Sequence, residues 1–152
     1  MNAHTDFIRI SRPANEVFAF LSDHTKLSLW SFGTWKTEFI PETGIVRGWS
    51  MKNGSKIYLK IQPYKEIGLI DYLLGPEPDA LVARIFVRIV AGSNLGGVDD
   101  ECGLTITALR TRDMDDLRWN SLIAAHVVEL DLIKSAIETG YDHRNPIHKT
   151  VK

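Results

Sequence analysis

The chain has 152 residues, of which 44% are hydrophobic and 24% are charged, and its formal net charge is −1 at pH 7. A chain of this length is typical of one domain, and it buries about 70% of the surface of the unfolded chain without a disulfide or a metal ion. The near-neutral charge does not favour nucleic acid or an anionic membrane surface as a partner.

The chain carries one cysteine, Cys102, and therefore no intrachain disulfide. A lone thiol is typical of proteins in a reducing compartment. Residues 1–6 show neither the basic nor the apolar region of a signal peptide, and no run of 18 apolar residues predicts a membrane span. We expect a cytoplasmic protein without a membrane span.

The chain begins with a predicted strand over residues 5–12, which places Ile8 and Ile10 on one face. Pro13 then starts a short helix, because its fixed φ suits the first helical turn. Asp23 is the predicted N-cap of a second short helix that reaches residue 30. The apolar residues of the first helix recur at helical spacing: Val17, Phe18 and Leu21.

Between residues 33 and 110 the hydrophobic period changes to two, which predicts strands. Asn53-Gly54 predicts a hairpin with a type I′ turn, in which both central residues need a positive φ. No helical pattern separates these strands, so they are expected to pair antiparallel. The six predicted strands are 34–40, 45–51, 55–62, 67–74, 80–90 and 101–111.

Four charged residues in these strands have an orientation that decides whether they can reach a ligand. Arg84 and Arg88 are four residues apart, so strict alternation places them on one face, opposite an apolar face that contains Ile85 and Val87. Such a pair could bind a ligand carboxylate, but we prefer to interpret it as a solvated outer face. The orientation of Arg47 and of Asp71 stays open.

A long amphipathic helix follows, with Asp113 as its predicted N-cap and Gly140 just past its end. Its length of about 40 Å requires a large partner surface, and the sheet is the available one. Residues 1–140 are thus predicted to form one domain, and residues 141–152 a polar tail. The apolar stripe of the helix comprises Trp119, Leu122, Ile123, His126, Leu130, Ile133 and Ile137.

The opening of the chain carries a recognisable motif. The segment from Ile8 to Asp23, I-R-I-S-R-P-A-N-E-V-F-A-F-L-S-D, resembles the small-Pro-Ala-x-x-Val-aromatic-x-x-Leu-x-Asp pattern of the START-like, or SRPBCC, superfamily. The resemblance covers residues 5–140. That superfamily includes pollen-allergen-type ligand binders, aromatic polyketide cyclases, lipid-transfer domains and ring-hydroxylase α-subunit domains.

The resemblance implies an α+β helix-grip fold. In that fold a curved antiparallel sheet of about seven strands and two short helices enclose a cavity together with a long C-terminal helix. The resemblance also implies that this cavity takes an apolar or amphipathic small molecule. It does not decide between a carrier and an enzyme, because one fold hosts many functions.

His126 is the one candidate catalytic residue, because it lies in the middle of the apolar stripe. It could act as a base or hydrogen-bond donor in the pocket. The alternative, which we prefer, is a structural histidine that a backbone carbonyl satisfies. The aromatic candidates suit an ordinary core equally well. The predicted ligand-binding residues are Trp30, Trp35, Trp49, Tyr72, Ile85, Val87, Trp119, Leu122, His126 and Leu130.

No cofactor or metal site is predicted. The glycine-rich segment 92–100 lacks the Gly-Lys-Ser/Thr ending of a phosphate-binding loop, and no helix follows it. His4, His24, His143 and His148 show no zinc-binding spacing.

Two functions are predicted from different classes. The first is binding of a lipid, isoprenoid or polyketide-like molecule, which needs no catalytic residue. The alternative is a polyketide cyclase or dehydratase that uses the same pocket, with His126 transferring a proton. A client-binding module ranks last, and the sequence leaves a homodimer open.

Overall fold

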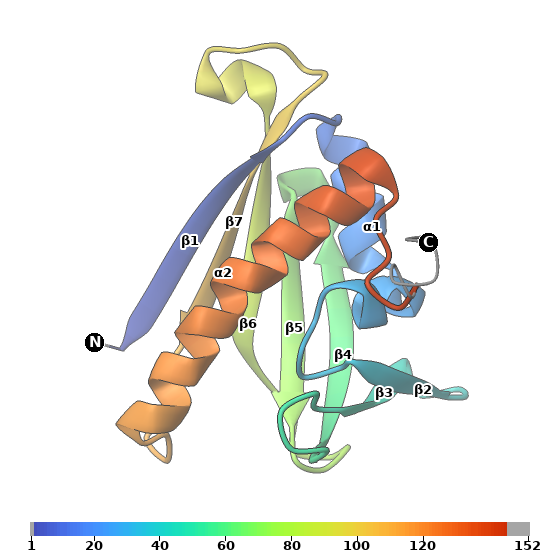
Figure 1. Cartoon of the computed structure of the whole chain (residues 1–152), viewed down its shortest axis with the longest axis vertical. Coiled ribbons are helices and arrows are strands. Elements are labelled where there is room, and N and C mark those ends of the chain that lie inside the picture. The colour runs from blue at the N-terminus through green and yellow to red at the C-terminus, as the bar shows by residue number, and fades with distance from the viewer. Residues whose placement is uncertain (1, 146–152) are drawn as a thin grey trace, which may run out of the picture.

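The computed structural model describes residues 2–145, and its centre is one seven-stranded antiparallel sheet with the order β1-β7-β6-β5-β4-β3-β2 (Figure 1). The predicted number of strands and their antiparallel pairing are confirmed. The strands are β1 (Ala3–Ile10), β2 (Lys36–Ile40), β3 (Ile45–Trp49), β4 (Lys56–Tyr64), β5 (Leu69–Gly75), β6 (Val82–Ala91) and β7 (Cys102–Leu109).

Helix α2 (Asp116–Thr139) crosses one face of this sheet obliquely. Helix α1 (Ala14–Ser22) lies beside the C-terminal end of α2 (Figure 1). Three short 3₁₀ helices, η1 (His24–Leu29), η2 (Lys65–Ile67) and η3 (Gly92–Leu95), complete the fold. The α+β helix-grip architecture is therefore confirmed. No helix within residues 2–145 combines the length and hydropathy that a membrane crossing needs.

The N-terminus of α2 differs from the prediction, which is wrong about its cap. Asp115 is the N-cap, and its carboxylate accepts a hydrogen bond of 2.7 Å from the backbone N–H of Arg118. Asp113 instead accepts a hydrogen bond from the Thr111 hydroxyl, within a turn that a hydrogen bond from Met114 N–H to the Thr111 carbonyl closes before the helix begins. The predicted C-terminal end is correct, since Gly140 has a φ of 70°.

The pairing register decides which residues face α2. Ile8 and Ile10 of β1 pair with Leu104 and Cys102, and all four belong to the packed interior, as the alternation predicts. Across the sheet the same face presents apolar residues from every central strand. Those with the least exposure are Val46, Leu59, Ile70, Tyr72, Val87, Leu104 and Ile106.

A β-bulge in β6 breaks the predicted alternation. Tyr72 of β5 pairs with Ile85, whereas the next residue, Leu73, pairs with Ala83, so Arg84 is an extra residue without a partner across the ladder. Arg84 is half-buried, while Arg88 is exposed on the outer face. The prediction that the two arginines share a solvated face is wrong for Arg84, because the bulge shifts the side-chain parity.

The predicted type I′ turn is also wrong. Gly54 has a φ of 67°, but Asn53 does not have a positive φ. The connection between β3 and β4 is a longer loop over residues 50–55, closed by a hydrogen bond from Gly54 N–H to the Ser50 carbonyl. The Asn53 side chain accepts a hydrogen bond from Ser55 N–H, which explains the different turn.

Arg47 and Asp71 both lie on the outer face of the sheet, which resolves the question that the sequence left open. Arg47 pairs across the sheet with Tyr58 and lies 5.6 Å from the centre of its ring. Asp71 pairs with Phe86, on the face opposite to Tyr72. Neither side chain can therefore reach the interior beneath α2.

Residues 141–145 contact the domain rather than extending away from it. The His143 ring stacks on Trp35 with 3.8 Å between ring centres, and its Nε2 lies 2.7 Å from the carbonyl oxygen of Ser28. The rest of the predicted tail, including His148, lies outside the described residues.

Candidate ligand-binding site

The interior contains two apolar clusters, and most of the predicted ligand-binding residues belong to one of them. The larger cluster includes Trp30, Tyr72, Val87 and Leu130. The smaller cluster is formed by Ala108, Met114 and Trp119, with Leu122 packed against it. Ile85 packs against both clusters and thus marks their junction on the sheet.

Trp35 and Trp49 do not join the other predicted site residues. Trp49 lies on the outer face, opposite Lys56, with the Lys36 ammonium 5.5 Å from its ring centre. Trp35 precedes β2 and packs between Phe32 and His143. The site proposed below therefore excludes both tryptophans.

His126 and Glu129 are buried on α2 between Trp119 of the smaller cluster and Leu130 of the larger one. Their closest atoms, His126 Nε2 and Glu129 Oε2, are 3.9 Å apart, which is too far for a hydrogen bond. Glu129 Oε1 instead accepts a hydrogen bond of 3.0 Å from the backbone N–H of Phe32. A second ionisable group thus lies beside the predicted one.

Sequence analysis missed Glu129, although its position carries a signal. Steps of three and four residues along α2 lead from Leu122 to His126, Glu129 and Ile133, so Glu129 occupies a place on the buried stripe. A charged residue at such a place is expensive to bury and is therefore a functional candidate.

Burial shifts the pKa of both groups toward their uncharged forms. It raises the pKa of Glu129 to about 7, and the hydrogen bond from Phe32 opposes that shift only in part. It lowers the pKa of His126 to about 4, with Asp6 opposing the shift and His4 and Arg84 adding to it. At neutral pH the imidazole is uncharged, and Glu129 is the group close to its own titration point.

Several buried polar side-chain atoms have no hydrogen-bond partner in the described part of the chain. Such groups are rare in native proteins, and each calls for water or a ligand as its partner. One of them, Arg47 Nε, belongs to the outer face. The others come from four separate segments around the interior: Trp30 Nε1, Thr34 Oγ1, Arg84 Nη1 and His126 Nδ1.

Tyr72 connects the sheet to the end of α1. Its hydroxyl donates a buried hydrogen bond of 2.8 Å to the Leu21 carbonyl, and the Trp30 ring meets its ring edge to face at 5.7 Å. Burial, together with the nearby Glu129 carboxylate, raises the pKa of Tyr72 well above its usual value. The side chain therefore remains a neutral hydrogen-bond donor at all physiological pH values.

Replacing Tyr72 with phenylalanine is expected to lower the free energy of unfolding by about 1–3 kcal/mol, because the Leu21 carbonyl would lose its buried partner. Urea unfolding of Tyr72→Phe and of Tyr64→Phe, whose side chain is exposed, would measure the difference. Equal stability of the two variants would show that the hydrogen bond contributes nothing.

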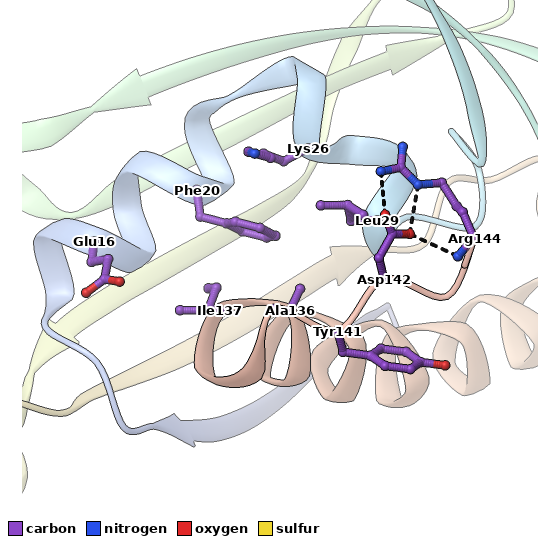
Figure 2. A pocket seen from close by; sticks show the side chains of 10 residues that line it. Glu16, Phe20, Lys26, Leu29, Ala136, Ile137, Tyr141, Asp142 and Arg144 are labelled. Carbon is purple, nitrogen blue, oxygen red and sulfur yellow. Dashed lines mark hydrogen bonds and ion pairs between the residues drawn. The ribbon is translucent and has the colours of Figure 1, made fainter. Parts of the chain in front are cut away.

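Two surface pockets flank α1, and neither is lined by a predicted site residue. One has a volume of about 370 Å³ and lies between α1, η1 and the C-terminal end of α2, where Phe20 and Ile137 form apolar walls near the Asp142–Arg144 ion pair (Figure 2). The other, of about 390 Å³, lies between α1 and the Pro63–Glu66 region. The predicted cavity beneath α2 is not one of them and stays a prediction.

The inner face beneath α2 is nevertheless incompletely covered. Of the seven strands, β1 makes the most extensive contact with α2. The apolar side chains of Ile57, Ile61 and Ile85, on strands β4 and β6, remain partly exposed, as does Leu122 on the helix. If the protein binds an apolar ligand beneath α2, we therefore expect it between α2 and strands β4–β6.

His4 and Asp6 lie on the same inner face as Ile8, with 2.9 Å between His4 Nε2 and Asp6 Oδ2. This places two more ionisable groups near His126, where the sequence alone showed only scattered histidines. Among residues 2–145, no three His, Cys, Asp or Glu side chains lie close enough together to hold a metal ion.

Comparison with known families and curated proteins finds no match to the sequence. Solved structures resemble the fold closely. The Zhui aromatase/cyclase from Streptomyces sp. R1128 is 16% identical, with a TM-score of 0.66 over 90% of this chain and 93% of that one. The Aha1 dimer protein from Colwellia psychrerythraea is 15% identical, with a TM-score of 0.66 over 92% and 98% of the two chains.

A further similar structure is DynU16, a protein of the dynemicin biosynthetic locus. It is 13% identical, with a TM-score of 0.63 over 93% of this chain and 49% of that one. Identities this low establish the fold and not the activity. Together with the order of elements, these similarities show that the chain has the same helix-grip fold as these solved structures, in agreement with the fold that the opening motif implies.

Proposed function

We propose that this protein binds an apolar or amphipathic small molecule, such as a lipid, an isoprenoid or a polyketide-like compound, between α2 and strands β4–β6. The observation that carries the proposal is the set of buried polar atoms without partners among residues 2–145, Trp30 Nε1, Thr34 Oγ1, Arg84 Nη1 and His126 Nδ1, within a mostly apolar interior. A bound molecule with a polar group would satisfy such atoms and fix its own orientation.

One further observation supports this location. The partly exposed Ile57, Ile85 and Leu122 would be covered by the apolar body of a ligand. Each Å² of apolar surface buried in this way contributes about 25 cal/mol before the cost of ordering. The unpartnered donors beside them would then select ligands with a polar end over pure hydrocarbons.

The experiment that tests the proposal is native mass spectrometry of freshly purified protein, followed by organic extraction and identification of any retained compound. We expect a mass above that of the bare chain and an extracted compound with an apolar body. If the protein carries nothing and no apolar probe binds it at micromolar concentration, the proposal is wrong.

Intrinsic fluorescence provides a second prediction, because the chain has tryptophans on both sides of the sheet. Binding of the neutral probe N-phenyl-1-naphthylamine should quench tryptophan emission chiefly through Trp30 and Trp119, which are buried in the interior. Trp30→Phe should therefore lose part of the quenching, whereas Trp49→Phe, on the outer face, should keep it. Equal quenching in the two variants would exclude Trp30 from the site.

Catalysis of the cyclase or dehydratase type is the second candidate, and the pair His126–Glu129 is the observation that favours it. A general base works best when its pKa is near the operating pH. Glu129, with a pKa of about 7, meets this condition better than His126, with a pKa of about 4. We therefore assign Glu129 the role of the base, with neutral His126 beside it as hydrogen-bond donor or acceptor.

We also propose that the protein is cytoplasmic. Cys102 is fully buried, and burial raises the pKa of its thiol to about 11, so it is an inert structural residue that does not call for an oxidising compartment.

A further inference from the structure

Arg84 is a cation in the interior without a matching anion. The bulge in β6 turns this residue away from the outer face, where Arg88 lies, and its Nη1 is buried without a hydrogen-bond partner. Burial lowers the pKa of its guanidinium, Arg118 adds to that effect, and Asp113 opposes it only in part. Asp113 is itself paired with Arg118 at 3.2 Å, and no carboxylate among residues 2–145 forms an ion pair with Arg84.

One further unpartnered group in this interior, Trp30 Nε1, also lacks an acceptor, whereas Thr34 Oγ1 and His126 Nδ1 can either donate or accept. The guanidinium of Arg84 and the indole of Trp30 can only donate hydrogen bonds. Glu129, the buried carboxylate among residues 2–145, accepts from Phe32 N–H and forms no ion pair with Arg84. Water could satisfy the hydrogen bonds, but it would not balance the charge of the guanidinium.

A further positive charge lies beside the N-terminal half of α2. Lys52, in the loop between β3 and β4, places its Nζ 3.1 Å from Ser121 Oγ on the N-terminal half of α2. The carboxylates of that end of the helix are engaged, since Asp116 pairs with Arg110 at 2.7 Å and Asp115 caps the helix. Within residues 2–145 Lys52 forms no ion pair with a carboxylate, so its charge remains available to an anion beside this half of α2.

We propose that the ligand carries an oxyanion at one end of its apolar body, and that Arg84 binds this oxyanion. The inference rests on the proposed binding function and adds the chemical class of the ligand. The planar guanidinium can donate two parallel hydrogen bonds to a carboxylate, an enolate or a phosphate oxygen pair. The apolar body then lies along Ile85 and Leu122, toward the junction of the two clusters.

The test uses three ligands of equal chain length, decanoate, decanol and decylamine, which displace the neutral probe N-phenyl-1-naphthylamine from the full-length protein at pH 8. We expect decanoate to displace the probe at a concentration about 10-fold or more below that of decanol, because a buried charge-assisted hydrogen bond contributes about 1.5–3 kcal/mol. Decylamine should be the weakest of the three. Decyl phosphate then distinguishes a carboxylate site from a phosphate site.

The matched variants are Arg84→Met and Arg88→Met, which remove the same charge from the inner and the outer face of one strand. Arg84→Met should lose the preference for decanoate and keep the affinity for decanol, while Arg88→Met should behave like the unmodified protein.

Two results would overturn the inference while leaving the binding function in place. The first is equal displacement by decanoate and decanol, which the unmodified protein reveals even if Arg84→Met does not fold. The second is an unchanged decanoate preference in a folded Arg84→Met. Failure of the probe and of all ligands to bind would instead overturn the proposed function, and the inference with it.

Discussion

Glu129→Gln is expected to be more stable than the unmodified protein above pH 7 and equally stable near pH 4. Burial raises the pKa of Glu129 from 4.5 to about 7, so the folded state holds this proton more tightly than the unfolded state does. The free energy of unfolding should thus fall as the pH rises from about 4.5 to about 7, by about 3 kcal/mol at roughly 1.4 kcal/mol per pKa unit. Glutamine keeps the acceptor for Phe32 N–H and removes the charge.

His126 contributes a pH dependence of the opposite sign. Its pKa falls from 6.5 to about 4 in the folded state, so its contribution to stability is present above pH 6.5 and is lost as the pH falls toward 4. Between pH 4.5 and 6.5 the two contributions nearly cancel in the unmodified protein. Removing either partner should therefore reveal the slope of the other.

Urea unfolding between pH 4 and pH 8 measures both slopes. Stability should rise with pH in Glu129→Gln and fall with pH in His126→Gln. Glu77→Gln, in the exposed turn between β5 and β6, controls for the change in net charge. Parallel pH profiles for the two buried-site variants would mean that the groups are not desolvated as their burial indicates.

The architecture was predictable because it rests on repeated signals. Alternation over six strands, the stripe along α2 and the Pro13-centred motif each involve many residues, so an error at one position does not change the result. Predictions of helix caps are less robust, because each depends on a single residue. Asp113 and Asp115 both suit an N-cap, and the choice of Asp115 is not visible in the local sequence.

The polar part of the site was not predictable for a physical reason. A single extra residue in β6 reverses the orientation of Arg84, and nothing in the local sequence announces the bulge. Glu129 is held by Phe32, which is 97 residues away in the chain, so its buried environment depends on tertiary contacts. Strands with one apolar face predict the core well, whereas a polar residue aimed into that core has no pattern of its own.

If the protein is an enzyme that acts on a chain of enolizable carbonyl groups, Glu129→Gln is expected to lower turnover by about 10²–10⁴-fold, the usual contribution of a general base. His126→Phe should cause a smaller loss of turnover, because the imidazole with a pKa of about 4 is a weak base that orients a hydrogen bond. Both variants should retain most of their affinity for apolar ligands, since Ile85, Trp119 and Leu122 are unchanged.

The pH profile separates the two roles. With Glu129 as the base, kcat/KM of the unmodified protein should rise with pH through about 7, where the carboxylate forms, and that rise should vanish in Glu129→Gln. Val127→Phe, on the exposed side of the same helix, is the control for added bulk. Normal turnover in both buried-site variants would remove the catalytic role from this pair.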